Sequence, residues 1–165
     1  MEGAFGELRD ALNAELLTQL KSVSPAFFES LVVQLLVKME YGGSIEDAGK
    51  AVGRSGDGGI DGVIKEDKLG LDSIFVQAKR WENNVGSGPV REFIGSLTVK
   101  RARKGVFLTT ARFSPEAKEC VKGLDQHIVL VDGERLASLM IENEVGVTLA
   151  QSYRVMKLDQ DFFDE

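Results

Sequence analysis

The chain has 165 residues, 43% of them hydrophobic and 28% charged, and a formal net charge of −6 at pH 7. Such proportions are typical of a globular protein with one domain, and no apolar run approaches the roughly 20 residues of a membrane-spanning helix. One cysteine, Cys120, and one histidine, His127, exclude an internal disulfide, a multi-cysteine zinc site and a histidine-rich metal site. The first ten residues lack the basic and apolar segments of a signal peptide.

Charge is unevenly distributed along the chain. Residues 1–74 carry 13 acids and 7 bases, residues 75–112 carry 2 acids and 8 bases, and residues 113–165 carry 11 acids and 5 bases. A basic middle between acidic flanks is typical of a protein that binds a polyanion such as DNA. A solvated charged surface without a partner is the alternative, and charge alone does not decide between them.

Two helices are predicted at the start of the chain. Apolar residues at helical spacing predict an amphipathic helix over about 4–21. Ser24-Pro25 has the form of an N-cap followed by a first-turn proline, and it predicts a second helix that runs to about Glu40. This second helix is apolar on most sides, so we expect it to be largely buried. Its expected buried residues are Phe27, Phe28, Leu31, Val32, Val33, Leu35, Leu36 and Val37.

The rest of the chain reads as strands followed by alternating helices and strands. A sharp turn is expected over 53–62, where five glycines occur. The elements predicted after it are strands at 60–65 and 73–79, a loop at 83–89, a helix from 90 to about 103, a strand at 105–110, a helix from Ser114-Pro115 to near Gly123, a strand at 127–131 and a helix capped by Asp132. This order predicts an α/β fold with a central mixed β-sheet flanked by helices.

Three parts of the chain are expected. Residues 1–23 form an N-terminal helix or linker, residues 24–158 form the main domain, and residues 159–165 form an acidic tail. Phe162 and Phe163 suggest that the tail docks against another surface.

Three polar residues are expected to meet at one edge of the sheet. Asp61 lies in the first predicted hairpin strand, and Gln77 and Lys79 lie one residue apart in the second. Because residues i and i+2 of a strand project from the same face, Gln77 and Lys79 can point together beside Asp61. Mg²⁺ prefers oxygen ligands, which Asp61, the Gln77 side chain and the Ala78 carbonyl can supply. This set suits metal-assisted phosphodiester hydrolysis, with Lys79 stabilising developing charge or positioning water.

Glu29 is a candidate fourth member of the site. It lies on the apolar second helix, on the same stripe as Val33 and Leu36. A carboxylate on such a face needs a partner, and Lys79 or a metal-bound water would serve. A carboxylate at the end of a helix that simply reaches water is the alternative.

Two sequence runs carry a family resemblance. Gly-Arg-Ser-Gly-Asp-Gly-Gly-Ile-Asp-Gly at 53–62 and Val-Gln-Ala-Lys-Arg-Trp at 76–81 resemble the catalytic domain of Mrr-type restriction endonucleases, within the PD-(D/E)XK nuclease superfamily. The likeness extends over most of the chain, from about Ser24 to 161–163. In this mapping Asp61 matches the motif aspartate and Lys79 the motif lysine. Gln77 stands where the superfamily usually has Glu or Asp, a replacement that the Mrr branch tolerates.

The resemblance implies a restriction-endonuclease-like core and metal-dependent cleavage of DNA. It implies Mg²⁺ as cofactor, with Mn²⁺ as an alternative, and double-stranded DNA, methylated DNA included, as partner. It also implies a cytoplasmic protein of a prokaryote that restricts modified foreign DNA. Because cutting both strands needs two active sites or a repositioned one, we expect a homodimer or higher oligomer.

Other readings of these residues stay open. A non-catalytic DNA-binding or assembly module on the same fold is the main alternative, motivated by Gln77 and the negative net charge. The same fold acting on branched DNA or RNA is another. We expect Trp81 to pack at the end of the sheet rather than stack on a base, and Thr109 and Thr110 to be structural. The candidate phosphate contacts are Arg80, Arg91, Lys100, Arg101, Arg103 and Lys104.

Overall fold

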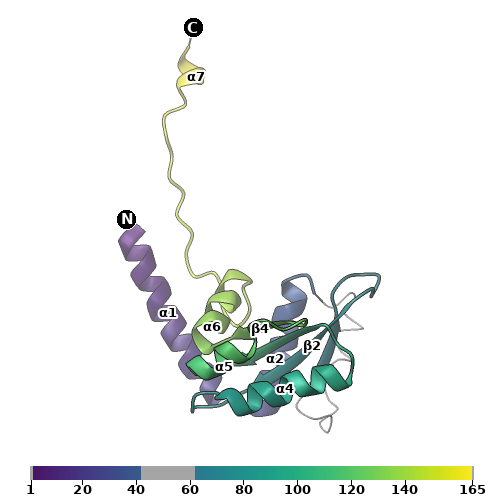
Figure 1. Ribbon diagram of the computed structural model, residues 1–165. Helices are drawn as coiled ribbons and strands as arrows, with labels where there is room; N and C mark the ends of the chain where they lie inside the picture. Colours follow the sequence, from purple (N-terminus) through teal and green to yellow (C-terminus); the bar gives the residue numbers. More distant parts are fainter. Residues whose placement is uncertain (1, 42–61, 165) are drawn as a thin grey trace.

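A mixed four-stranded sheet forms the centre of the molecule (Figure 1). The computed structural model describes residues 2–41 and 62–164. Within them, β1 (Gly62–Lys65) pairs antiparallel with β2 (Ser73–Lys79). β3 (Lys104–Thr109) and β4 (His127–Val131) follow in parallel, which gives the order β1-β2-β3-β4. The predicted central mixed sheet is therefore confirmed.

Helices cover both faces of this sheet. Residues of α1 (Glu2–Ser22), α2 (Pro25–Lys38) and α6 (Gly133–Glu142) form one core cluster with the sheet. Residues of α4 (Ser87–Val99) and α5 (Pro115–Cys120) form a second cluster with the sheet. The sheet thus has an α2 face and an α4 face, and alternate residues of each strand belong to one or the other.

Three polar side chains cap the helices that the sequence predicted from them. Ser24 accepts a hydrogen bond from the Phe27 backbone N–H at 3.1 Å, and Ser114 accepts one from Ala117 at 3.1 Å. Asp132 accepts one from Arg135 at 2.9 Å. Each bond satisfies a backbone donor that the first turn of a helix leaves without a partner.

The predicted helix over 90–103 was wrong at both ends. α4 begins at Ser87, because Pro89 lies in its first turn, where the missing N–H costs no helical bond. It ends at Val99, because Arg101 adopts a left-handed conformation (φ 54°) and the chain turns there. α5 is also shorter than predicted: it ends at Cys120, before the turn at Gly123 (φ 70°).

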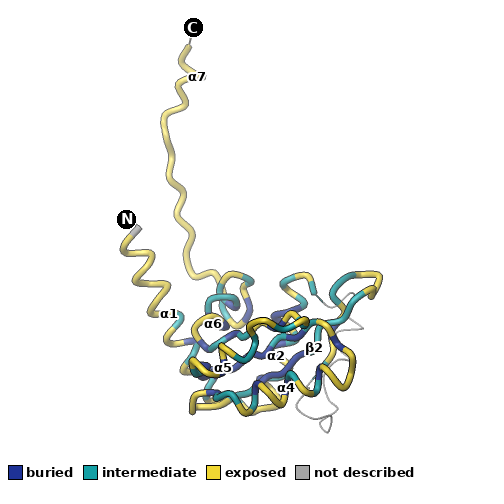
Figure 2. Tube along the Cα trace, in the orientation of Figure 1, coloured by how far each residue is buried: buried dark blue, intermediate teal, exposed yellow. Residues whose placement is uncertain are grey.

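One expectation about burial was also wrong. Phe27 is 56% exposed, because it lies on the outer side of α2, while Phe28, Leu31, Val32, Leu35 and Leu36 are buried. Phe162 and Phe163, in the short helix α7 (Gln160–Phe163), are exposed and pack on each other rather than on the body. The segment that leads to them extends away from the sheet (Figure 2).

The first helix is divided into two environments. Leu16 and Leu20, in its C-terminal half, are buried in the core cluster of the α2 face, where α1 packs against α6. Its N-terminal half projects from the body with Phe5, Leu8 and Leu12 exposed (Figure 2). None of the described helices is long and apolar enough to cross a membrane.

Candidate active site

The candidate site lies at the C-terminal end of β2. Gln77 is 1% exposed and Lys79 is partly exposed. The described pairing of β1 with β2 begins at Gly62 opposite Val76, so Gln77, Ala78 and Lys79 follow the first described pair. Asp61, which immediately precedes Gly62, lies outside the described residues. The structure therefore places two members of the predicted trio.

The two faces of β2 have different neighbours. Val76 and Ala78 belong to the core cluster of the α2 face, whereas Phe75 packs against the cluster of the α4 face. Because side chains alternate along a strand, Gln77 and Lys79 share the α4 face with Phe75. The alternation of Phe75, Val76 and Ala78 is the one that the predicted common orientation of Gln77 and Lys79 requires.

Glu29 lies on the α2 side of the same sheet edge. It lines a small crevice with Gly62, Ile64, Val76 and Ala78. The structure thus brings Glu29 beside the residue that follows Asp61 and beside the predicted metal-binding carbonyl of Ala78. It does not place Glu29 on the face that carries the Gln77 and Lys79 side chains.

The backbone after Gln77 is held by residues of the neighbouring strand. The Lys79 carbonyl accepts hydrogen bonds from the Thr109 hydroxyl (2.8 Å), the Trp81 N–H (3.1 Å) and the Thr110 N–H (3.3 Å). The Thr110 hydroxyl donates to the Trp81 carbonyl at 2.7 Å. Thr109 and Thr110 are 0% and 1% exposed.

Trp81 lies beside the candidate catalytic lysine. The Lys79 Nζ atom is 5.5 Å from the centroid of the Trp81 ring, within the range of a cation–π interaction. Trp81 is 36% exposed, so it contacts Lys79 at the edge of the molecule rather than being fully buried at the end of the sheet.

Arg80 contacts another part of the chain. Its Nη1 atom donates a hydrogen bond to the Lys21 carbonyl, in the last turn of α1, at 2.9 Å. This contact joins the residue after Lys79 to the N-terminal helix, a relationship that sequence spacing could not reveal.

The remaining candidate phosphate contacts do not gather around Lys79. In the parallel register Lys79 pairs with Thr109 at one end of the sheet, and Ile74 pairs with Lys104 at the other. Lys100, Arg101 and Arg103 lie in the turn before Lys104, so they occupy this opposite end. Arg91 is exposed on α4, nearer to its start.

Lys104 is engaged by two acids of the β1–β2 hairpin. Its ammonium contacts the Glu66 carboxylate and, at 2.9 Å, the Asp72 carboxylate. Hydrogen bonds to Glu66 and Asp72 raise the pKa of Lys104 above its ordinary value. The Lys104 ammonium and then the Ser73 backbone N–H lower the pKa of Asp72.

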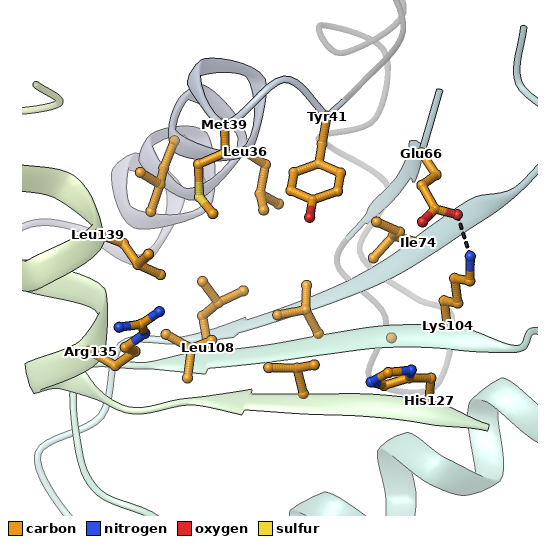
Figure 3. Close-up of a pocket in the computed structure, with 15 residues that line it drawn as sticks. Leu36, Met39, Tyr41, Glu66, Ile74, Lys104, Leu108, His127, Arg135 and Leu139 are labelled. Atoms are coloured by element: carbon orange, nitrogen blue, oxygen red, sulfur yellow. Dashed lines mark hydrogen bonds and ion pairs between the residues drawn. The ribbon is translucent and has the colours of Figure 1, made fainter. Parts of the chain in front are cut away.

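An apolar cavity of about 380 Å³ lies on the α2 face, between α2, α6 and the sheet (Figure 3). Leu36, Met39 and Tyr41 line the α2 side, Leu139 and Arg135 lie on α6 at one end, and the Lys104–Glu66 pair lies at the other end. Neither Gln77 nor Lys79 lines it, so this cavity is separate from the candidate site.

The donors around the end of β2 suit a hard cation. Gln77 offers an amide oxygen and Ala78 a backbone carbonyl, both of the oxygen type that Mg²⁺ binds, while the Glu29 carboxylate lies on the α2 side of the sheet. Among residues 2–41 and 62–164, His, Cys, Asp and Glu side chains form no group of three or more that could hold a metal. A metal at this place would therefore need amide and backbone oxygens of the described residues, or side chains from outside the described ranges.

Known proteins resemble the chain in sequence and in fold. Residues 20–140 match the Mrr_cat restriction endonuclease family. The Type IV methyl-directed restriction enzyme EcoKMrr of Escherichia coli (strain K12) is 48% identical over 164 residues, 99% of this chain. The chain spans 53% of that relative.

Two solved structures share the fold. The modification-dependent restriction endonuclease AspBHI matches with a TM-score of 0.60 at 21% identity, over 84% of this chain and 36% of its own. The MspJI restriction endonuclease, solved with a 27-mer oligonucleotide, matches with a TM-score of 0.52 at 22% identity, over 82% of this chain and 31% of its own. The sheet is therefore of the restriction-endonuclease type, and on the sequence match over residues 20–140 the chain belongs to the restriction endonuclease family.

Proposed function

We propose that this chain is a metal-dependent endonuclease domain that hydrolyses phosphodiester bonds in double-stranded DNA. The observation that carries the proposal is the pair Gln77 and Lys79 on one face at the end of β2, directly beyond the residue that pairs with Gly62. Membership of the restriction endonuclease family supports it.

Each residue has a proposed role. Asp61, Gln77 and the Ala78 carbonyl hold Mg²⁺, or Mn²⁺ in its place. Bound metal activates water and offsets charge on the phosphate. Lys79 donates hydrogen bonds to phosphate oxygens that gain negative charge as the bond breaks. Glu29 adds a carboxylate on the α2 side of the Ala78 carbonyl.

Modified DNA in a bacterial cytoplasm is the proposed target. The relative from Escherichia coli is named a methyl-directed enzyme, and AspBHI is named modification-dependent. We propose that this chain acts on the same class of DNA. Phosphate contacts by Arg91, Arg101 and Arg103 would add affinity without sequence information, whereas Arg80, Lys100 and Lys104 already have partners within the protein.

The test is cleavage of methylated and unmethylated supercoiled plasmid in Mg²⁺, Mn²⁺ or EDTA. Asp61→Asn and Lys79→Ala should each abolish metal-dependent nicking. Asp125→Asn and Lys68→Ala, which remove the same charges at exposed positions, should leave it unchanged. Cleavage that survives Lys79→Ala would contradict the proposed site.

The alternative is a DNA-binding module without catalysis, and Gln77 in place of an acid is what favours it. Such a module would bind DNA in the presence of EDTA and would not cleave it in the presence of Mg²⁺ or Mn²⁺. Lys79→Ala would then weaken binding no more than loss of another exposed base.

We also propose that residues 1–23 form an N-terminal helix or linker, residues 24–158 the nuclease domain and residues 159–165 an acidic tail.

We further propose that the chain forms a homodimer or a higher assembly. Exposed apolar side chains recur on α1 and along the tail, and apolar surface of this kind would be removed from water by a second copy of the chain. They are Phe5, Leu8, Leu12, Leu149, Tyr153, Val155, Met156, Leu158, Phe162 and Phe163. Light scattering of the full chain and of residues 1–147 tests this, and a full-length monomer would contradict it.

A further inference from the structure

We propose that Thr109 and Thr110 are positioning residues that hold Lys79 and Trp81 in place for the reaction. This inference rests on the proposed catalytic role of Lys79. Thr109 is the last residue of β3 and Thr110 follows it, and the inference gives both side chains a role in addition to packing.

The two hydroxyls act on the two carbonyls that flank Arg80. Thr109 donates to the Lys79 carbonyl at 2.8 Å, and Thr110 donates to the Trp81 carbonyl at 2.7 Å. β2 ends at Lys79, and in the described residues pairing beyond it resumes at the single bridge between Val85 and Phe113. The threonine hydroxyls therefore fix the path of residues 79–81 where regular pairing has ended.

The side chains on this path meet each other. With both carbonyls held, the Trp81 ring lies 5.5 Å from the Lys79 Nζ atom. The ring restricts where the ammonium can go, and a long lysine side chain otherwise samples many rotamers. A lysine that stabilises a reacting phosphate needs this restriction, because misplacement by about 1 Å can cost ~100-fold in rate.

Burial makes the arrangement rigid. Thr109 and Thr110 are essentially inaccessible, and the Thr109 hydroxyl oxygen also accepts the Ala111 N–H at 3.2 Å. Gly133, the first residue of α6, packs directly against the Thr110 carbonyl, where a Cβ would not fit. The first residue of α6 thus packs against the Thr110 backbone, while the two threonine hydroxyls bond to the backbone of Lys79 and Trp81.

The test uses Thr109→Val and Thr110→Val, which keep side-chain shape and remove the hydroxyl. We expect the single-turnover rate at saturating plasmid in Mg²⁺ to fall by about 10-fold to 100-fold, with DNA affinity in EDTA unchanged. Thr109→Ser and Thr110→Ser, which restore the donor, should recover most of the rate. Thr18→Val, which removes a hydroxyl bond to a helix carbonyl in α1, should not change it.

Trp81 is the one tryptophan of the chain, so its fluorescence gives a readout that does not depend on activity. Thr110→Val should raise quenching of Trp81 by acrylamide, and Thr110→Ser should not. Trp81→Leu, at a position that is partly exposed, should lower the rate in a stable protein. This variant keeps the test decisive if a valine variant does not fold.

Failure of the inference differs from failure of the proposed function. An active Lys79→Ala variant would overturn the role of Lys79 and with it this inference. An inactive Lys79→Ala variant beside fully active valine variants and a fully active Trp81→Leu variant would overturn the inference alone. The inference would also be overturned if the valine variants lost rate only in proportion to the fraction of unfolded protein and the serine variants did not restore the rate.

Discussion

Arg80 Nη1 donates a hydrogen bond to the Lys21 carbonyl at 2.9 Å, which ties the residue after the candidate catalytic lysine to the end of α1. The first helix is therefore fastened at the same sheet edge that carries Gln77 and Lys79. The Arg80 guanidinium is engaged within the protein, whereas an arginine that serves only to contact a DNA phosphate would point into solvent.

Arg80→Ala should lower the free energy of unfolding by about 1–2 kcal/mol, because the bond to Lys21 is lost. Arg91→Ala, at an exposed position of α4, should change it by less than about 0.5 kcal/mol. Urea unfolding followed by circular dichroism measures both. Equal stability of the two variants would show that the contact with α1 contributes nothing.

The Lys104–Asp72 pair should make stability depend on pH. Lys104 lowers the pKa of Asp72 in the folded state. The pair therefore stabilises the folded protein fully at a pH above the ordinary aspartate pKa, and this stabilisation is lost as the pH falls through the lowered pKa of Asp72 in the folded protein. Asp72→Asn should therefore lower the urea midpoint at pH 7, and the difference from wild type should shrink as the pH falls below the ordinary aspartate pKa. Asp125→Asn is the control. A difference that stays constant as the pH is lowered would exclude the ion pair as its cause.

Salt dependence of DNA binding should reflect which candidate phosphate contacts already have partners within the protein, as Arg80, Lys100 and Lys104 do. The other three (Arg91, Arg101 and Arg103) predict a slope of log K against log salt of about −2.7, whereas all six predict about −5.4. Arg103→Ala should reduce the slope by about 0.9, and Lys104→Ala should leave it unchanged. Titrations in EDTA at several salt concentrations measure this, and a steeper slope that depends on Lys104 would refute it.

Gly105→Ala should destabilise the fold by about 1–3 kcal/mol. A Cβ at this position of β3 would approach Leu97 Cδ1 to 2.8 Å and Phe93 Cζ to 2.9 Å. Gly95→Ala on α4, where a Cβ meets nothing within 4 Å, should instead stabilise by about 0.5–1 kcal/mol. Opposite shifts in the urea midpoint are expected, and a neutral Gly105→Ala would mean that α4 lies further from β3.

Gln77→Glu should strengthen metal binding, because it adds a negative charge to the proposed ligand set. The Mg²⁺ concentration for half-maximal cleavage should fall by about tenfold, equivalent to about 1.4 kcal/mol. In EDTA the buried carboxylate should lower the unfolding temperature, and Mg²⁺ should restore it. Gln126→Glu is the matched control, and an unchanged metal requirement in Gln77→Glu would remove Gln77 from the metal site.

Local signals predicted much of the fold. The bounds of β2 and β4 and the caps Ser24, Ser114 and Asp132 agree with the sequence, because alternation and capping depend on neighbouring residues. The start of α4 was predicted after Pro89, because the sequence alone does not distinguish a proline in the first turn of a helix from a proline in a loop. The relative placement of Gln77 and Lys79 followed from strand period alone.

The contacts that were missed connect distant segments. Lys104 and Glu66 are 38 residues apart, and Arg80 and Lys21 are 59 apart. No spacing rule links such pairs before the fold is known. Thr109 and Thr110 left a weaker signal: parallel strands end at one edge of a sheet, so threonines at the end of β3 were candidates to touch the end of β2.

The parallel register of β2 and β3 also sets a length. From Ile74 beside Lys104 to Lys79 beside Thr109 the sheet advances five residues, or about 16 Å at ~3.3 Å per residue. One strand of B-DNA advances about 3.4 Å per nucleotide, so this span equals roughly five base pairs. A duplex lying along the strands and cut at Lys79 would meet Arg101 and Arg103 about half a helical turn from the broken bond. The length of the strands would then fix the distance between the cut and these contacts. A duplex that ends within about five base pairs of the cut would lose the contacts with Arg101 and Arg103 while still reaching Lys79.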